Sequence, residues 1–409
     1  MRPTGRLHIG HYFGALQNWN KLQNDPQNQY ECFFFIADWH ALTSDYADTS
    51  AVAQNSIEIA IDWLAAGLDP EKSTLFVQSA VPEHAELHLL LSMVTPLGWL
   101  ERVPTYKEAL DNIKDKDLHT YGFLGYPVLQ CADIVIYGDP ETELIVPVGE
   151  DQVSHVEISR EIVRRFNNLY VDIDEEFIKC VSRSTVEVNE FNIVINADTP
   201  LDVARSEIRR AIAEIGVENF RQKFEVRLKA VLREPEAMLT HTPRIPGLDG
   251  RKMSKSYGNA ITLSESDESI RAKTRVMTTD PARKRRTDPG NPDICPAYDW
   301  HKLFSPPDTL AWAANGCRTA GIGCIECKSA MAENLIKWIA PVRQRRVDYE
   351  QQPERVLEIL DTGSKRARMV AQQTMDRVRE AVFHWSDKRA EIAGGPREAK
   401  QVKNIPAGS

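Results

Sequence analysis

The sequence predicts an α/β protein built on a doubly wound parallel sheet, with a small α+β insertion and a helical C-terminal region. Three observations carry this prediction. The first half alternates short apolar β-rich runs with helical patterns; residues 171–232 change to a hairpin pattern; and residues 260–400 are mostly helical. With 409 residues, 42% of them hydrophobic and 27% charged, the chain is long enough for a sizeable core and two or three domains.

The alternating pattern gives the order of the predicted sheet. Its elements are strands at 31–37, 73–78 and 144–148 and helices at 52–66, 82–97, 131–137 and 153–166. Strands joined in this way run parallel, and such sheets bind ligands at the carboxyl ends of their strands.

The insertion and the C-terminal region follow different patterns. Residues 178–188 and 191–196 form a plausible hairpin, and a helix starts after Thr199. The role of this insertion stays open between a substrate clamp, a dimer accessory and a spacer. Further on, residues 331–349 and 353–383 read as long helices broken by Pro341 and Pro353. The tail 395–409 is polar, and we expect it to be flexible.

Charge is distributed unevenly along the chain. The net charge is −9, made up of −17 over residues 1–250 and +8 over residues 251–409. A basic second half suggests a polyanionic partner, with a solvated helix surface as the alternative. No apolar run approaches the ~18 residues of a membrane span, and the N-terminus lacks the apolar stretch of a secretory signal. We therefore expect a soluble cytoplasmic protein.

Two histidines flank a glycine in the segment 7–11, which reads Leu-His-Ile-Gly-His. The glycine would let a helix N-terminus approach a ligand, and free backbone N–H groups there favour anions. His8 and His11 could donate hydrogen bonds to phosphate oxygens. The motif alone is a moderate signal because other nucleotidyltransferases share it, and a chance pair of histidines is the alternative.

A second motif, Lys-Met-Ser-Lys-Ser, occupies residues 252–256. Lys252 and Lys255 lie three residues apart on a loop rich in Gly and Ser, where point charges can meet a polyphosphate as negative charge develops. A solvated basic loop is the alternative, and the five-residue match downstream of the histidine motif argues against it. The sequence has no Walker P-loop and no Gly-x-Gly-x-x-Gly, which disfavours a GTPase or a dehydrogenase.

Together these motifs resemble the signatures of class I aminoacyl-tRNA synthetases, and the segments between them resemble tryptophanyl-tRNA synthetases. The segments that carry this resemblance are 36–42 (Ile-Ala-Asp-Trp-His-Ala-Leu), 126–134 (Tyr-Pro-Val-Leu-Gln-Cys-Ala-Asp-Ile) and 146–152 (Val-Pro-Val-Gly-Glu-Asp-Gln). The resemblance implies a Rossmann-like catalytic domain at 1–170 and 233–262, an inserted subdomain at 171–232, and a helical tRNA anticodon-binding domain at 263–394.

The resemblance also implies an ATP site that accepts Mg²⁺-bound ATP. His8, His11, Lys252 and Lys255 would be its catalytic groups, framing the triphosphate as four cations. The residues that it places at ATP are Arg2, Pro3, Thr4, Gly10, His11, Gly149, Glu150, Asp151, Ile245, Lys252, Met253, Ser254, Lys255 and Ser256.

For the amino acid, the resemblance implies that Asp133 accepts the indole N–H, and that Tyr126, Gln130, Gln152 and His40 line the pocket. A buried carboxylate is costly unless it is hydrogen-bonded. One that is aimed at an indole N–H therefore penalises side chains without that donor, and such sites can reject analogues by ~10⁴–10⁵. An ordinary helix carboxylate is the alternative for Asp133.

The implied function is ATP-dependent attachment of L-tryptophan to tRNA(Trp) through tryptophanyl-adenylate, with release of AMP and pyrophosphate. The resemblance also implies a homodimer and no membrane partner. Alternatives are a tyrosyl-tRNA synthetase, a small-molecule adenylyltransferase and a non-catalytic iron–sulfur RNA-binding paralogue. The family has a β-strand ahead of the histidine motif, and the seven residues before His8 leave no room for it, so we expect that strand to be missing.

Four cysteines cluster as Cys295, Cys317, Cys324 and Cys327. In a cytosolic chain this pattern points to metal rather than to disulfides, and thiolate ligation selects zinc or an iron–sulfur cluster. The uneven spacing is similar to that of a subset of bacterial tryptophanyl-tRNA synthetases with a 4Fe-4S cluster. We therefore expect a structural 4Fe-4S cluster, with Zn²⁺ as the alternative.

Two basic stretches are candidates for contact with tRNA phosphates. One is the run 283–286, and the other consists of Lys365, Arg366 and Arg368 on a later helix. A solvated helix face is an equally good explanation for both.

Overall fold

Four strands form two parallel pairs in the computed structural model. β1 (Cys32–Ile36) pairs with β2 (Ser73–Val77), and β3 (Leu144–Val148) pairs with β8 (Pro235–Leu239). The predicted strands are thereby confirmed, and their parallel direction follows from the helices that connect them. The first residue of the chain lies beside β1, because the Met1 amino group donates to the Phe35 carbonyl over 2.6 Å.

The structure describes most of the chain. The described residues are 1–27, 29–112, 116–170, 172–173, 186–188, 193–195, 199, 201–216, 219–220, 228–240 and 245–393.

Short helices connect the strands and cover both faces of the two pairs. Their bounds are α1 (Ile9–His11), η1 (Tyr12–Leu16), α2 (Gln17–Gln23), α3 (Asp38–Asp45), α4 (Val52–Ala65), η2 (Gln78–Ala80), α5 (Glu83–Val94), α6 (Leu97–Leu100), α7 (Pro104–Asn112), α8 (Tyr121–Leu124), α9 (Tyr126–Val135), η3 (Glu150–Gln152) and α10 (Val153–Leu169). Two apolar cores result, one around α4 and β1 and one around α5, α9 and α10. The predicted helices of this half are confirmed, with shifted ends.

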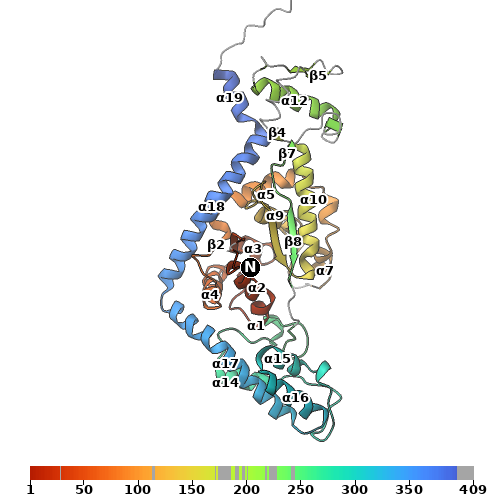
Figure 1. The fold of residues 1–409 in the computed structure, drawn as a ribbon, viewed down its shortest axis with the longest axis vertical. Coiled ribbons are helices and arrows are strands. Elements are labelled where there is room, and N and C mark those ends of the chain that lie inside the picture. Colours follow the sequence, from red (N-terminus) through yellow and green to blue (C-terminus); the bar gives the residue numbers. More distant parts are fainter. Residues whose placement is uncertain are drawn as a thin grey trace, which may run out of the picture.

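The insertion lies at one end of the elongated molecule (Figure 1). It holds the antiparallel pair β4 (Asp172–Ile173) and β7 (Leu228–Lys229), the hairpin β5 (Val186–Val188) with β6 (Ile193–Ile195), and α12 (Leu201–Ile215). The predicted hairpin and helix are present, although much of the segment 174–192 lies outside the described residues.

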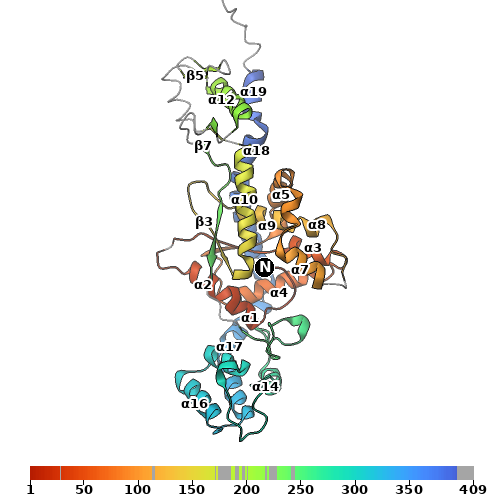
Figure 2. The same ribbon diagram turned by 90° about the vertical axis from the view of Figure 1, so that its right-hand side faces the viewer.

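The C-terminal region is helical: α14 to α17 occupy the end opposite the insertion, whereas α18 and α19 run back to the end where the insertion lies (Figures 1 and 2). Its elements are η4 (Lys255–Tyr257), α14 (Asp267–Arg275), η5 (Pro292–Ile294), α15 (Pro296–Phe304), α16 (Pro307–Arg318), α17 (Cys324–Glu350), α18 (Pro353–Phe383) and α19 (Trp385–Ala393). The tail 395–409 lies outside the described residues.

The predicted helix break at Pro341 is wrong, because α17 continues through this residue. Proline removes one N–H of the helix ladder, and here Pro341 is exposed, as is Lys337, whose carbonyl would accept that N–H. The buried side chains of Ile339 and Val342 hold the helix in place on either side. The break at Pro353 is confirmed, because α18 begins there.

Helix α18 runs from the middle of the molecule to the insertion and packs on β2 (Figure 1). Its Gly363 lies so close to the strand that an added Cβ would be 1.8 Å from the Leu75 carbonyl oxygen. A glycine is therefore required for this approach of helix to strand. In the part of the chain that is described, no helix is both long and apolar enough to cross a membrane.

Candidate functional site

The histidine motif forms the start of a helix at the junction of both halves of the chain. Leu7 and Ile9 are buried and anchor it, while the His8 N–H donates to His11 Nδ1 over 3.1 Å. The two imidazole rings are stacked with 3.7 Å between their centroids. A Cβ on Gly10 would lie 2.9 Å from His8 Nδ1, so the glycine makes room for the ring.

Both histidines are neutral at neutral pH. Burial, and then the nearby Lys255 charge, lower the pKa of His8 to about 4. Burial, followed by His8 and Lys255, lowers the pKa of His11 to about 3. The expected frame of four cations is therefore wrong for the ligand-free protein, because burial disfavours the charged imidazole. The rings remain N–H donors.

The two motif lysines have different surroundings. Lys255 is half-buried, donates from Nζ to the Thr4 carbonyl over 2.7 Å, and lowers the pKa values of both motif histidines. Burial lowers the pKa of Lys255 itself. Lys252 is exposed, and its carbonyl accepts from the Asn259 side chain. Lys255 is thus joined to the histidine motif, while the Lys252 side chain faces solvent.

The other predicted ATP residues differ in burial and come from several elements. Met253 and Ile245 are buried in the same core as the histidine motif, and Gly149 and Glu150 directly follow the carboxyl end of β3. Pro3 is buried, Arg2, Thr4 and Glu150 are exposed, and Ser254 is half-buried. The side chains of Asp151 and Ser256 lie outside the described residues.

Asp133 is a fully buried acid with protein donors on both oxygens. His40 Nε2 lies 2.8 Å from Oδ2 and His84 Nδ1 2.5 Å from Oδ1, while Gln78 Nε2 donates to both over 2.8 Å. Burial alone would raise the pKa of Asp133, but the hydrogen bonds and charges of His40 and His84 outweigh it and lower the pKa. Asp133 is therefore ionised. His40 follows β1 and Gln78 follows β2, so two strand ends meet at this acid.

The remaining pocket residues form a second polar chain. Tyr126 Oη contacts Thr105 Oγ1 at 2.5 Å and His155 Nε2 at 3.2 Å, and His155 Nδ1 contacts Gln130 Oε1 at 2.9 Å. Gln152 is half-buried at the end of η3. The structure thus connects Tyr126 with Gln130 as predicted residues of one pocket, through a histidine and a threonine that had no predicted role.

Three further residues escaped the sequence reasoning: Gln78, His84 and Tyr137. They contact Asp133 directly or through one another. The position of Gln78 directly after strand β2 was a usable signal, because ligands bind at strand ends in such sheets. Nothing local marks His84 or Tyr137.

Met1 links the residues predicted at the phosphates with those predicted at the amino acid. The Met1 amino group interacts electrostatically with Asp133 and lowers the pKa of His11. Burial lowers the pKa of this amino group to about 5. Met1 thus lies within electrostatic reach of both Asp133 and the histidine motif.

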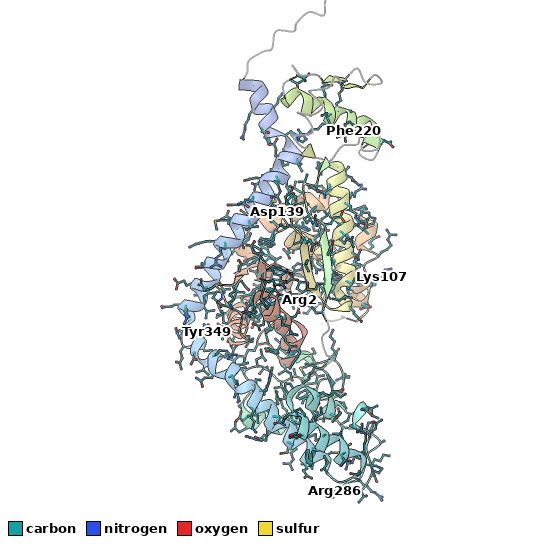
Figure 3. All side chains as sticks on the ribbon, in the orientation of Figure 1. Arg2, Lys107, Asp139, Phe220, Arg286 and Tyr349 are labelled. Carbon is teal, nitrogen blue, oxygen red and sulfur yellow. The ribbon has the colours of Figure 1, made fainter. Side chains whose placement is uncertain are left out.

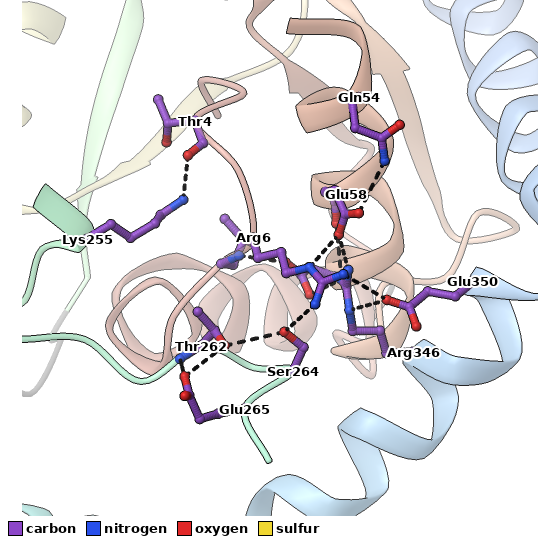
Figure 4. A network of polar contacts seen from close by, with 12 residues as sticks. Thr4, Arg6, Gln54, Glu58, Lys255, Thr262, Ser264, Glu265, Arg346 and Glu350 are labelled. Carbon is purple, nitrogen blue, oxygen red and sulfur yellow. Dashed lines mark hydrogen bonds and ion pairs between the residues drawn. The ribbon is translucent and has the colours of Figure 1, made fainter. Parts of the chain in front are cut away.

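A buried ion-pair network supports the histidine motif from behind (Figure 4). The Leu7 N–H donates to Asp62 Oδ2 over 2.6 Å. Arg346, from α17, donates to both Asp62 and Glu58 of α4. Asp62 and Arg346 are 0% and 1% exposed. Burial raises the pKa of Asp62 to about 6, against the charge of Arg346. The C-terminal region is thereby connected to the residue that precedes His8.

The four cysteines lie close enough together to affect one another's ionisation. Burial, followed by the other three thiols, raises the pKa of Cys327 to about 12. Cys295 is buried, whereas Cys317 and Cys324 are half-buried. Within the described residues, no three or more His, Cys, Asp or Glu side chains meet in an arrangement ready to hold a metal ion.

A basic cleft of about 860 Å³ opens beside these cysteines and includes the run 283–286, Trp312 and Ile325. Arg283 is buried and donates to the carbonyls of Arg286 and Ile322, so its role is structural. The other three cations of the run are exposed. Figure 3 shows Arg286 at the far end of the helical region, away from Arg2.

Of the second predicted basic stretch, Arg366 and Arg368 contact the catalytic half, whereas Lys365 is exposed. Arg368 donates to the Glu83 carboxylate over 2.9 Å, and Arg366 donates to the Pro70 carbonyl over 3.1 Å. Both residues therefore help to dock α18 onto the catalytic half. Their predicted role in phosphate contact is not supported by these surroundings.

Comparison with known proteins gives a consistent result. Residues 1–186 and 210–340 match the family described as tRNA synthetases class I (W and Y). Tryptophan–tRNA ligase from Ralstonia nicotianae is 47% identical over 394 residues, covering 93% of this chain and 96% of the relative. The Thermotoga maritima enzyme of the same name is 44% identical over 383 residues, covering 93% and 97%.

A solved structure of similar fold is the tryptophanyl-tRNA synthetase of Campylobacter jejuni complexed with ADP and tryptophan. It is 29% identical and has a TM-score of 0.70, with 93% of this chain and 98% of that chain covered. The family match spans both halves of the site described above, including the histidine motif, Asp133 and the lysine loop. The chain belongs to the tRNA synthetases class I (W and Y) family.

Proposed function

We propose that this protein attaches L-tryptophan to tRNA(Trp) at the expense of ATP. The observation that carries the proposal is an ionised, buried Asp133 that is linked through Met1 to the two class I signatures, which meet at His11 and Lys255. Relatives named tryptophan–tRNA ligase, aligned over nearly the full chain, support the choice of amino acid.

The reaction needs no protein nucleophile. A carboxylate oxygen of tryptophan attacks the α-phosphorus of ATP, and the bond to the pyrophosphate oxygen breaks. A ribose hydroxyl of the tRNA's terminal adenosine then attacks the carbonyl carbon of tryptophanyl-adenylate, and AMP leaves. The protein supplies positioning and charge stabilisation. Mg²⁺ enters as part of the ATP substrate.

His8, His11 and Lys255 stabilise the triphosphate in this proposal. The stacked imidazoles are neutral before ATP binds, so they add N–H donors without repelling Lys255. Lys255 carries the charge and already lies against Thr4. Lys252 is exposed on the same loop, and we assign it to the pyrophosphate after the loop closes.

Asp133 selects the amino acid by accepting the indole N–H. Its negative charge favours a ring that has an N–H donor over a ring without one. Tyr126, Gln130, Gln152 and His40 line the rest of the pocket. The tyrosine enzyme, which shares both signatures, is the alternative that the assay below separates.

The four cysteines bind a 4Fe-4S cluster with a structural role, and Zn²⁺ is the alternative. The donor chemistry suits either group, because thiolates ligate both, and Arg283 and Lys328 are close enough to balance thiolate charge, although the described thiols are not arranged as a metal site in this structure. The group would cross-link η5, α16 and the start of α17. Anaerobic purification with iron, sulfide and zinc analysis tests this: a brown protein with iron supports the cluster, and stoichiometric zinc in a colourless protein contradicts it.

The residues 263–394 form the region that binds the anticodon of tRNA. The exposed cations of the run 283–286 and the half-exposed Trp312 line the 860 Å³ cleft, and together they suit phosphates and an unstacked base. Arg285→Ala should weaken tRNA binding and leave tryptophan activation unchanged. Equal tRNA affinity of the variant and the original protein would contradict this assignment.

The functional form is a homodimer. Leu89, Met93 and Leu97 follow one another at intervals of four residues across α5 and α6, and their side chains are 53%, 72% and 58% exposed. An exposed apolar row of this kind favours burial against a partner. Light scattering of Met93→Glu tests this: loss of a dimer seen for the original protein supports the interface.

Amino-acid-dependent ATP–pyrophosphate exchange tests the proposed function as a whole. Exchange with tryptophan and little with tyrosine is the expected result, followed by charging of tRNA(Trp). Exchange with tyrosine instead would identify the tyrosine enzyme. No exchange with either amino acid would indicate the non-catalytic RNA-binding alternative.

A further inference from the structure

The carboxylate of Asp133 is held differently at its two oxygens. Gln78 Nε2 donates to both oxygens and His84 faces Oδ1, and both of these side chains are fully buried. Oδ2 faces His40, whose side chain is 12% exposed. Of these three donors His40 is the most exposed, so we expect a ligand to approach Asp133 from the side of Oδ2.

His84 continues into a further hydrogen bond. Its Nε2 lies 2.6 Å from the Tyr137 hydroxyl. The ring lies among the aromatic side chains of Phe35, Phe76 and Tyr137. Asp133, His84 and Tyr137 thus form a chain that leads from the amino-acid pocket into the apolar core.

The direction of this chain follows from the chemistry of its members. An ionised carboxylate only accepts hydrogen bonds, so His84 must carry a hydrogen on Nδ1. Its Nε2 then shares a hydrogen bond with the Tyr137 hydroxyl. Burial raises the pKa of Tyr137 well above its usual value, so this hydroxyl keeps its proton.

We propose that His84, oriented by Tyr137, is a positioning residue that fixes the plane of the Asp133 carboxylate and thereby sets the preference for an amino-acid side chain with a ring N–H. The proposal rests on the proposed function, in which Asp133 accepts the indole N–H. His84 itself does not touch the substrate. It holds Oδ1, and Oδ2 is left in a fixed direction for the ligand.

Loss of His84 has a specific consequence under this proposal. Oδ1 then keeps only the donor from Gln78, so the carboxylate plane is less firmly fixed and proton uptake is easier, because burial opposes its charge. A hydrogen bond to a charged group supports discrimination of about 10- to 100-fold. The preference for a ring N–H should therefore fall by that factor, while ATP binding is unaffected.

The test compares L-tryptophan with β-(3-benzothienyl)alanine, in which sulfur replaces the ring N–H. The measured quantity is the ratio of kcat/KM for the two amino acids in ATP–pyrophosphate exchange. His84→Leu should lower this ratio about 10- to 100-fold with the KM for ATP unchanged. His84→Asn should restore much of it, because the Asn amide can place an N–H near the Nδ1 position.

Tyr137→Phe keeps the ring and removes the hydroxyl, so it should lower the ratio by a smaller factor. Tyr170→Phe is the matched control, since Tyr170 packs at the edge of the same core, and it should leave the ratio unchanged. If His84→Leu does not fold, Tyr137→Phe and His84→Asn decide the matter: an unchanged ratio in Tyr137→Phe would then overturn the proposal.

Asp133→Asn distinguishes the positioning role of His84 from the proposed function, in which Asp133 accepts the indole N–H. If Asp133→Asn abolishes the preference and His84→Leu lowers both rates equally, His84 is merely structural and the positioning role is wrong. If Asp133→Asn also leaves the ratio unchanged, Asp133 does not read the ring N–H and both proposals fail.

Discussion

Two parts of the site, the surroundings of Asp133 and the histidine motif with its support, treat buried charge in opposite ways. At the amino-acid end, Asp133 stays ionised although it is 2% exposed. At the phosphate end, burial prevails: His8 and His11 are neutral, and the pKa of Asp62 rises to about 6. The difference lies in the hydrogen-bond donors. Asp133 has contacts from His40, His84 and Gln78, whereas Arg346 donates to both Asp62 and Glu58.

This contrast fits the two ligands. A neutral indole is best selected by a charge that is always present. A triphosphate brings its own charge, so neutral imidazoles avoid repulsion before it binds and can gain protons when it arrives. Depth of burial alone would not reveal this division.

The largest effect is expected from removing Arg346, whose ion pairs hold α4 behind the histidine motif. Arg346→Met leaves Asp62 and Glu58 without their buried cation, so the free energy of unfolding should fall by about 3–5 kcal/mol. Urea denaturation measures it. Arg271→Met is the matched control, since its ion pair with Glu333 is exposed and should matter by about 0–1 kcal/mol. Equal effects of both variants would contradict the buried role of Arg346.

The next prediction distinguishes the role of Lys255 from the role of Asp133. Lys255→Ala should lower the rate of adenylate formation about 10²–10³-fold, because a preorganised charge at the phosphates is lost. Tryptophan affinity should change little, since Asp133 is untouched. Pre-steady-state pyrophosphate release and equilibrium dialysis measure the two quantities, with Lys302→Ala as the control, because Lys302 pairs with Asp299 on α15. Lost tryptophan binding with an intact chemical rate would refute the assignment.

A smaller effect concerns pH. The folded pKa of Asp62 is about 6 and its ordinary value is 3.8, so the folded state binds the proton more tightly. The contribution of Asp62 to stability is present below pH 4 and is lost as pH rises through 6. Relative to Asp62→Asn, the original protein should lose about 1 kcal/mol per pH unit across this window. Parallel stability curves for the two proteins would argue against the raised pKa.

His11 should show the opposite sign. Its pKa falls from 6.5 to about 3 on folding, so the unfolded chain binds the proton first, and stability falls as pH drops below 6.5. The original protein should lose about 1 kcal/mol per pH unit there relative to His11→Asn. Asparagine keeps an acceptor for the His8 N–H. If the stability difference from the original protein changed with pH in the same direction for Asp62→Asn and for His11→Asn, the opposite pKa shifts of this acid and this base would be contradicted.

Much of the catalytic half could be predicted from local patterns. The apolar runs gave β1, β2 and β3, and the two signatures led to residues that do meet, as Lys255 and His11 show. Pro341 was misjudged because packing of α17 outweighs a local propensity.

The missing parts of the site depend on long-range contacts. His84 and Asp133 are 49 residues apart, and Arg346 and Asp62 are 284 residues apart. No periodicity or spacing connects such pairs, because the fold alone brings them together. The charge states were also beyond reach, since neutral histidines and an ionised buried acid depend on desolvation and on donors from several elements.

The central claim is that an ionised Asp133 offers one oxygen to the ring N–H of the substrate. A crystal structure with bound L-tryptophan tests it most directly. We expect the indole nitrogen within about 2.7–3.2 Å of Asp133 Oδ2, with His84 still on Oδ1. An indole bound elsewhere, with Asp133 contacting protein donors alone, would contradict the account.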